Sequence, residues 1–274
     1  MNHTVHYSWS EYTALAQQSK KSGKALERDR DWAGCTFAQA VKMATVEGYA
    51  SKVTEAENIA GAVSTNVLTD VLQETFQATW DVAGAEVDMG RFLAGAPECM
   101  VESQPIKIAR AGRAVRIAVP VGYSSSVPAE QILRRGACVV ALALVLQQMK
   151  HPLEIWAGFC TDRSGYHYAQ MAQVQRADEP FDIGRVMYAL AHPSMLRQLG
   201  FAVADMQPEA VRQFHGMHRG GGYGRGYAIH EDDLDQSAGT TIIVPDNDRG
   251  MSWTVQESVR WIEQQLDRIF GEEV

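Results

Sequence analysis

Between His215 and His230 the sequence sets tyrosines and arginines among glycines, a combination that suits the binding of unpaired nucleotides. Six glycines lie from Gly216 to Gly226, and a segment so rich in glycine loses much conformational entropy when it is ordered. Aromatic rings stack on unpaired bases, while arginines contact the phosphates. Duplex DNA exposes no base faces, so the pattern predicts a preference for single strands. The residues expected to make these contacts are Arg219, Tyr223, Arg225, Tyr227 and Phe214.

The same segment is open to other interpretations. It is a plain flexible loop if its rings and charges bind nothing. Histidine-rich stretches also bind metals, but His215, His218 and His230 on a chain without a regular period form a weak site. We therefore predict neither a metal nor another cofactor. The acidic run from Glu231 to Asp235 either shields the segment when nothing is bound or serves only solubility.

Further cations extend the positively charged track that such binding needs. Lys107, Arg110, Arg113 and Arg116 recur every three residues. We count Arg110 and Arg113 among the nucleic-acid-binding candidates. A second group of five lysines and arginines lies between positions 20 and 30. The alternative for both groups is a solvated surface.

A serine turn, Gly122-Tyr-Ser124-Ser-Ser126, follows a predicted strand and precedes a predicted helix. Ligands of parallel α/β sheets bind at the carboxyl ends of strands. The hydroxyls and helix amides suit a phosphate, or the serines simply cap the helix. A nucleophile elbow has a glycine two residues after its serine, and Ser126 stands there instead. Because the sequence identifies no histidine and acid partner, we predict that the protein is not an enzyme.

The elements that must position these residues change character along the chain. After position 114, apolar runs predict strands over 115–121, 153–159, 167–175 and 240–244. Amphipathic stretches predict helices over 129–149, 181–199 and 254–270. Strands that alternate with helices of this length predict an α/β fold with a Rossmann-like, largely parallel layered sheet.

In the first part of the chain, most apolar residues recur at the spacing typical of helices. Ser10 is expected to cap a helix over 11–21, and apolar residues at helical spacing predict helices over 36–53 and 66–80. We therefore expect a mainly helical region over residues 1–105. An α/β domain should follow over 106–274, with a flexible Gly/Arg/Tyr loop at 214–230.

Composition limits the classes of protein that fit. Apolar residues make up 46% of the 274 residues and charged residues 21%, which is typical of a folded globular protein. The longest apolar run, Ala137 to Leu146, is about half of what a membrane crossing needs. With no secretory signal at the start, we expect a cytoplasmic protein. A formal charge of -8 argues against a nucleic-acid coat but allows a local basic groove. The four scattered cysteines predict free thiols.

The second half resembles a von Willebrand factor A domain. The first loop of that family has the pattern Asp-x-Ser-x-Ser before a helix, and residues 122–126 match it with Gly122 in place of the Asp. The resemblance covers roughly residues 113–270 and implies a layered α/β sheet with a metal-binding loop. A hard divalent cation requires carboxylate oxygens, so the loss of the acid leaves Ser124 and Ser126 as poor ligands.

Two other segments, Asp81–Glu102 and Asp31–Tyr49, resemble parts of a phage-encoded family of unassigned domains. The functional counterpart in that group is a single-stranded-DNA-binding RNA polymerase cofactor of podophages that encode their own middle-gene polymerase. The resemblance implies a viral DNA-binding protein that recruits the phage RNA polymerase for transcription in the host cell cytoplasm. It assigns no individual residues.

We therefore expect a non-catalytic protein that binds single-stranded DNA and a phage RNA polymerase. The alternative is a von Willebrand A-like adaptor for an AAA+ ATPase, marked by an ion at Ser124 and Ser126. A homo-oligomer is compatible with both. Stacking and phosphate contacts serve DNA and RNA alike, so the sequence leaves that choice open.

Overall fold

The computed structural model describes residues 2–19, 30–63, 72–109, 114–163, 165–217, 227–234, 239–246 and 252–270. The chain divides into two compact units. Unit 1 comprises residues 1–63 and 113–274, and unit 2 comprises residues 64–112. Within the described ranges, none of the helices combines the length and apolar character that a membrane crossing requires.

Unit 1 is built on a five-stranded sheet in the order β1-β7-β6-β5-β8. Central β5 (Val115–Pro120) pairs in parallel with β6 (Leu153–Arg163) and with β8 (Thr240–Ile243). Strand β6 turns back into antiparallel β7 (Tyr166–Gln175), and β1 (His3–Ser8) adds in parallel to β7. The sheet is therefore mostly parallel, and among its described strands only β6 and β7 pair antiparallel.

Helices from both the N-terminal and the C-terminal parts of unit 1 pack with this sheet. All six residues of β5 are buried, as expected for a central strand covered on both faces. The α-helices of unit 1 are α1 (Trp9–Gln18), α3 (Arg30–Ala33), α4 (Phe37–Lys42), α5 (Val53–Ala62), α8 (Ala129–Gln148), α9 (Ile183–Ala191), α10 (Phe201–Asp205), α11 (Glu209–Phe214) and α12 (Val255–Phe270). π-Helical turns span Met43–Glu47 and Met195–Gly200, and 3-10 turns span Ala50–Lys52 and Glu231–Asp233.

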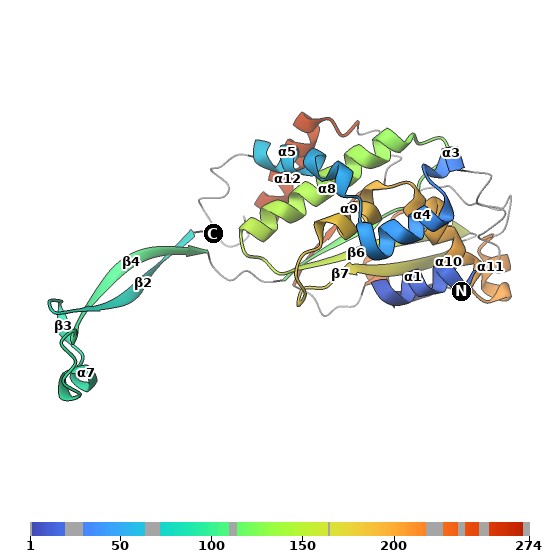
Figure 1. The fold of residues 1–274 in the computed structure, drawn as a ribbon. Coiled ribbons are helices and arrows are strands. Elements are labelled where there is room, and N and C mark those ends of the chain that lie inside the picture. The colour runs from blue at the N-terminus through green and yellow to red at the C-terminus, as the bar shows by residue number, and fades with distance from the viewer. Residues whose placement is uncertain are drawn as a thin grey trace. The chain divides into compact units, whose positions relative to one another are not determined.

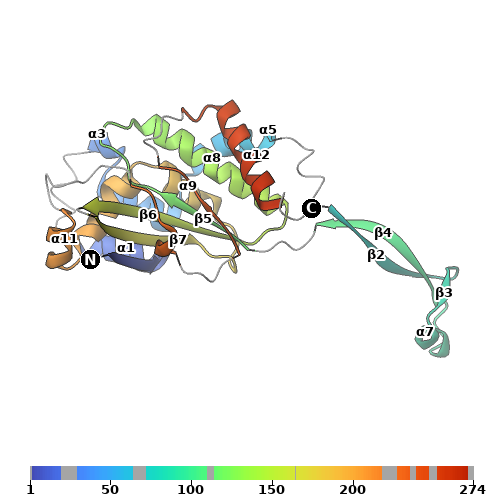
Figure 2. The same ribbon diagram turned by 180° about the vertical axis from the view of Figure 1, so that it is seen from behind.

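The two faces of the sheet are covered differently. Helices α1, α8 and α9 pack against one face, as Figure 1 shows. In Figure 2, which views the molecule from behind, β6 and β7 lie in front of α1 and α9. On this second face the segment from Tyr227 to Leu234 packs over a core cluster that includes Trp156, Cys160 and Met171. The segment that follows the glycine-rich stretch is thus part of the core.

Unit 2 is a β-ribbon with a short helix. Strand β2 (Leu72–Asp81) pairs antiparallel along its full length with β4 (Met100–Ala109), and β3 (Glu86–Val87) pairs with the start of β4. Helix α7 (Met89–Leu93) follows β3, and the Asp88 side chain caps it by accepting from the Arg91 backbone N–H at 3.1 Å. In the sequence, this ribbon follows the first part of unit 1 and precedes the second part.

The structure agrees with the sequence in fold class and departs from it in several elements. The helix predicted over 36–53 is divided into α4, a π-helical turn and a 3-10 turn. The fold is mixed α/β, and the predicted strands β5 to β8 and helices α8, α9 and α12 are present. The predicted helix over 66–80 is wrong where the structure describes it, because Leu72–Asp81 is strand β2. Strand β1 was not expected. Helix α1 is capped by Ser8 and not by Ser10, since the Ser8 hydroxyl accepts from the Glu11 N–H.

The expected division of the chain also differs from the two units. A helical region over 1–105 and an α/β domain over 106–274 would separate α1 and α5 from the sheet. In the structure, β1 is a strand of that sheet, and α5 packs on α8. The N-terminal segment therefore belongs to unit 1, and the ribbon of unit 2 is inserted between its two parts.

Candidate functional site

Two exposed aromatic rings lie together just before the glycine-rich segment. Phe214 ends α11 and Tyr166 begins β7, and their ring centroids are 5.1 Å apart in an edge-to-face arrangement. Phe214 is 45% exposed and Tyr166 is 44% exposed. Exposed Arg163 donates from Nη1 to the Gln213 carbonyl at 3.3 Å, which ties the β6–β7 turn to α11. We call Arg163, Tyr166 and Phe214 the aromatic edge.

Of the residues expected to contact nucleic acid, two are described. Phe214 lies in the aromatic edge. Tyr227 is partly buried and packs against the core cluster beneath the segment 227–234, so only part of its ring is accessible. The other five candidates lie outside the described residues: Arg110, Arg113, Arg219, Tyr223 and Arg225.

The cationic track before β5 is shorter than the sequence suggested. Arg116, its last member, is buried, and its Nε donates to Glu154 Oε2 at 2.9 Å. In a strand, every second side chain points to the same face. Residues spaced three apart therefore point to opposite faces in turn, and a strand cannot place them all on one surface. Including Arg116 in a surface track was therefore wrong.

A histidine cluster, formed by Asp162, His167, His230 and Asp233, lies beside the aromatic edge. Asp162 near the end of β6 faces His167 at the start of β7, and His167 Nδ1 is 2.7 Å from Asp162 Oδ1. On the other side of the ring, His167 Nε2 is 2.8 Å from Asp233 Oδ2. The His230 ring stacks on His167 with centroids 4.0 Å apart. One imidazole thus lies between two carboxylates.

Asp233 is the most enclosed member of the histidine cluster, with a side chain 2% exposed. Its Oδ1 accepts from the Thr4 hydroxyl and its Oδ2 from the His230 backbone N–H, both at 2.8 Å. His6 Nε2 contacts its backbone oxygen at 2.6 Å. Strand β1 and the 3-10 turn Glu231–Asp233 therefore hold this carboxylate in one place.

The electrostatics of the histidine cluster favour a positive charge on the ring. Burial alone lowers the pKa of His167, but the hydrogen bonds and charges of Asp233 and Asp162 outweigh it and raise that pKa. Burial acts to raise the pKa of Asp233, but hydrogen bonds from His167, the His230 backbone and Thr4 outweigh it and lower that pKa. The arrangement therefore stabilises a cation between two anions.

The sequence contained part of this signal. Ser164-Gly165 between two strand patterns predicts a hairpin, and Gly165 has the positive φ of +79° that such turns require. That hairpin sets Asp162 opposite His167. Asp233 and Thr4 are 229 positions apart, so no local pattern could join them. The sequence alone therefore identified no histidine and acid partner, because part of this grouping comes together only in the fold.

The serine turn has a different structure from the capping arrangement considered above. The Oγ atoms of Ser124 and Ser126 are 3.0 Å apart and exposed. Helix α8 begins after Pro128, which makes no side-chain capping bond. The capping interpretation was wrong because the turn ends before the helix begins.

Two buried arginines support the serine turn. Arg135 of α8 donates to the carbonyls of Pro120 and Pro245, at 2.9 and 2.8 Å. Arg197 donates to the Val127 carbonyl at 2.7 Å and lies over the Trp32 ring. Burial lowers the pKa of both guanidiniums, which Tyr123 partly offsets. Two cations beside a turn without carboxylates disfavour a metal ion there.

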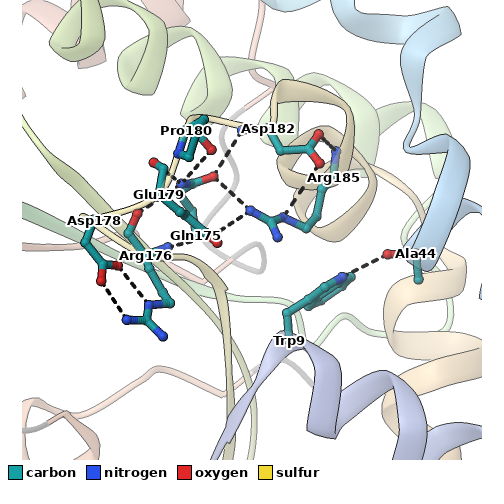
Figure 3. Close-up of polar contacts among 9 residues, drawn as sticks. All are labelled: Trp9, Ala44, Gln175, Arg176, Asp178, Glu179, Pro180, Asp182 and Arg185. Carbon is teal, nitrogen blue, oxygen red and sulfur yellow. Dashed lines mark hydrogen bonds and ion pairs between the residues drawn. The ribbon is translucent and has the colours of Figure 1, made fainter.

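A cavity of about 300 Å³ opens between α1, the π-helical turn Met43–Glu47 and the start of α9. Figure 3 shows its polar surroundings. Trp9 Nε1 donates to the Ala44 carbonyl at 2.8 Å, and Arg185 Nη2 donates to Glu179 at 2.7 Å and Gln175 at 3.2 Å. Because Arg185 is already engaged by protein groups, we assign no ligand to this cavity.

Comparison with known proteins places the chain in a family. Residues 3–265 match a family described as a domain of unknown function, DUF7192. The chain belongs to this family. No curated protein and no solved structure matches it. Membership in DUF7192 agrees with the resemblance to a family of unassigned domains, and it covers both units of the structure.

Proposed function

We propose that this member of DUF7192 binds single-stranded nucleic acid, without catalysis, at the aromatic edge and the adjoining glycine-rich segment. The observation that carries the proposal is the exposed pair Tyr166 and Phe214 beside exposed Arg163. In the sequence, Phe214 lies just before the glycine-rich segment, which begins after Met217 and ends before Tyr227. The edge and the segment together supply rings and arginines for one strand.

The chemistry of this surface suits unpaired bases. A base that stacks on an aromatic ring gains about 1–3 kcal/mol, whatever its identity. Tyr166 and Phe214 stand edge to face, and both residues are partly exposed to solvent. A guanidinium such as that of Arg163 contacts a phosphate or stacks on a base. This combination favours a flexible single strand over a duplex.

We further propose that the protein is a single-stranded-DNA-binding cofactor of a phage RNA polymerase. The resemblance of Asp31–Tyr49 and Asp81–Glu102 to a phage-encoded family supports this proposal. So does the tip of unit 2, which carries six of the eleven large apolar side chains that are strongly exposed in the described residues. These six are Trp80, Val82, Val87, Met89, Phe92 and Leu93.

The charge of this tip indicates which partner it fits. Between Gln77 and Ser103 the chain has five carboxylates and one arginine. That arginine, Arg91, lies over the Trp80 ring at 4.7 Å. An acidic rim repels a phosphate backbone and suits a protein groove bordered by basic side chains. We therefore assign the polymerase contact to the tip of unit 2 and the nucleic-acid contact to unit 1.

Charging the tip should separate these two activities. With Phe92→Asp and Leu93→Asp together, the complex with the phage polymerase should be lost, because carboxylates replace two strongly exposed apolar side chains of α7. Oligonucleotide affinity should stay the same. The control is Val46→Asp, which charges an equally exposed apolar residue of unit 1. Pull-down with the purified polymerase measures the result, and retention of the doubly charged variant would contradict this assignment.

The direct test of nucleic-acid binding is its salt dependence. Exchanging Arg219 and Arg225 for alanine should weaken binding and reduce the log–log salt slope by about 1.4, since a single strand contributes about 0.7 per phosphate neutralised. Fluorescence anisotropy of a labelled oligonucleotide at several salt concentrations measures both. Arg134→Ala with Arg176→Ala removes two exposed arginines elsewhere and should change neither. An unchanged slope in the Arg219 and Arg225 variant would remove these residues from the site.

The second candidate is a von Willebrand A-like adaptor for an AAA+ ATPase. In its favour, the serine turn follows β5 and precedes α8, where ligands of parallel sheets bind. Against it, Gly122 removes the loop carboxylate, and Arg135 and Arg197 supply positive charge beneath the turn. We therefore prefer the single-strand proposal.

A further inference from the structure

We infer that Asp162, His167 and His230 form a binding site for one divalent transition-metal ion of the zinc class, with Asp233 orienting His167. A carboxylate oxygen and two ring nitrogens of these three residues all lie within 4.8 Å of one another. They come from the end of β6, the start of β7 and the segment 227–234. Three separate parts of the chain thus bring metal-binding atoms to one point.

Asp233 determines which nitrogen of His167 faces the site. Its oxygen at 2.8 Å from Nε2 is fixed by Thr4 and by the His230 backbone, so it accepts the Nε2–H. A neutral imidazole then has a lone pair on Nδ1. That lone pair points to Asp162 Oδ1, which is also an acceptor, at 2.7 Å. A proton on Nδ1 bridges these two atoms as a hydrogen bond, and a metal ion bound here would replace that proton and satisfy both acceptors.

A buried carboxylate on the far nitrogen is the usual partner of a metal-binding histidine. It fixes the ring orientation and raises the basicity of the ligand. Asp233 has this position, and its side chain is 2% exposed. His167 is itself only 7% exposed, whereas Asp162 is 37% exposed and His230 lies at the surface. The ligand atoms therefore lie between a rigid interior and an accessible exterior.

The ligand set indicates the class of ion. Two imidazole nitrogens and one carboxylate oxygen suit zinc and its neighbours, which also accept a water as a fourth ligand. Calcium and magnesium prefer sites made of oxygen ligands and are disfavoured here. Coordination distances near 2.1 Å require Asp162 and His167 to move apart slightly, and exposed His230 to rotate toward them.

A second group, Cys160 with His167 and Asp233, is also close enough to bind a metal. All three residues of that group are buried. The Cys160 side chain belongs to the core cluster beneath the segment 227–234. An ion there would need a path through packed side chains, so the outer group is the site that we assign.

Metal binding can be measured without nucleic acid, which keeps it separate from the proposed function. The full chain is treated with a chelator, exchanged into metal-free buffer, and titrated with zinc in a calorimeter. Cobalt is added in parallel, since its visible absorption reports nitrogen and oxygen ligation. We expect one ion per chain with each metal. Failure to bind either metal would overturn the inference and leave the single-strand proposal standing.

Variants distinguish this site from the histidines of the glycine-rich segment. Asp162→Asn and His230→Gln change accessible ligands and should each weaken zinc binding at least tenfold. His218→Gln and Asp232→Asn are matched controls at nearby positions and should bind zinc as the unaltered chain does. Zinc affinity that survives in both ligand variants, or that falls with His218→Gln instead, would overturn the assignment. Far-ultraviolet circular dichroism verifies that each variant is folded.

Discussion

Exchanging both Tyr166 and Phe214 for alanine should weaken binding of a single-stranded oligonucleotide by about 30-fold or more. Each ring that stacks on a base contributes about 1–3 kcal/mol, so two rings contribute about 2–6 kcal/mol, and every 1.4 kcal/mol is about tenfold in affinity. The rings are 45% and 44% exposed, so their removal leaves the core of unit 1 intact. Anisotropy titration of a labelled oligonucleotide measures the loss.

The chain offers close controls for this prediction. Tyr166→Phe with Phe214→Tyr keeps both rings and should retain affinity. Trp80→Ala removes an aromatic ring of similar exposure from acidic unit 2 and should also leave binding unchanged. If the double alanine variant binds normally, or if Trp80→Ala causes the same loss, the aromatic edge is not the stacking surface.

Much of unit 1 could be predicted because its signals are local. Strand β5 is apolar except for Arg116, and every one of its residues is buried. The long helix α8 has apolar residues on nearly all sides in its middle, as a helix covered by α5, α9 and α12 requires. Such elements are determined by their own composition, and the sequence predicts both their type and their approximate bounds.

The elements that were missed depend on partners distant in the chain. The residues of β2 have apolar side chains at helical spacing, but Phe76, Ala78 and Trp80 also alternate with Gln77 and Thr79. Pairing with β4 along the full strand decides between these two periods. In the same way, β1 is a strand because β7 offers it an edge more than a hundred and fifty positions away. Local propensity alone gives no such information.

The candidate site likewise contains some residues that the sequence could identify and others that only the fold brings together. The glycine-rich segment and Phe214 are recognisable by composition, since rings and arginines among glycines are unusual in packed structure. Tyr166 and Arg163 join them only because α11 lies against the β6–β7 turn. The histidine cluster likewise needs Thr4 and Asp233 on neighbouring elements. Residue types can thus indicate a chemistry, while the fold determines which residues share it.

A close backbone contact lies at the border of the cavity between α1, the π-helical turn and α9. Gly48 ends the π-helical turn with φ of 62° and ψ of -162°, a conformation that is essentially restricted to glycine. The next residue, Tyr49, donates its backbone N–H to the Gly184 carbonyl at 2.9 Å. A Cβ added at Gly48 would lie 2.5 Å from the Gly184 carbonyl carbon. The start of α9 and the π-helical turn therefore meet where no side chain fits.

Gly48→Ala should accordingly lower the free energy of unfolding by about 2–6 kcal/mol. Backbone strain contributes about 1–3 kcal/mol and overpacking against backbone atoms about 1–3 kcal/mol. Gly184→Ala is the reciprocal control, since its Cβ would meet atoms only at 3.5 Å or more, and it should be nearly neutral. Gly61→Ala, with open space in α5, should stabilise by about 0.5–1 kcal/mol. Urea denaturation measures all three, and equal stabilities of the Gly48 and Gly184 variants would show that the contact is not tight.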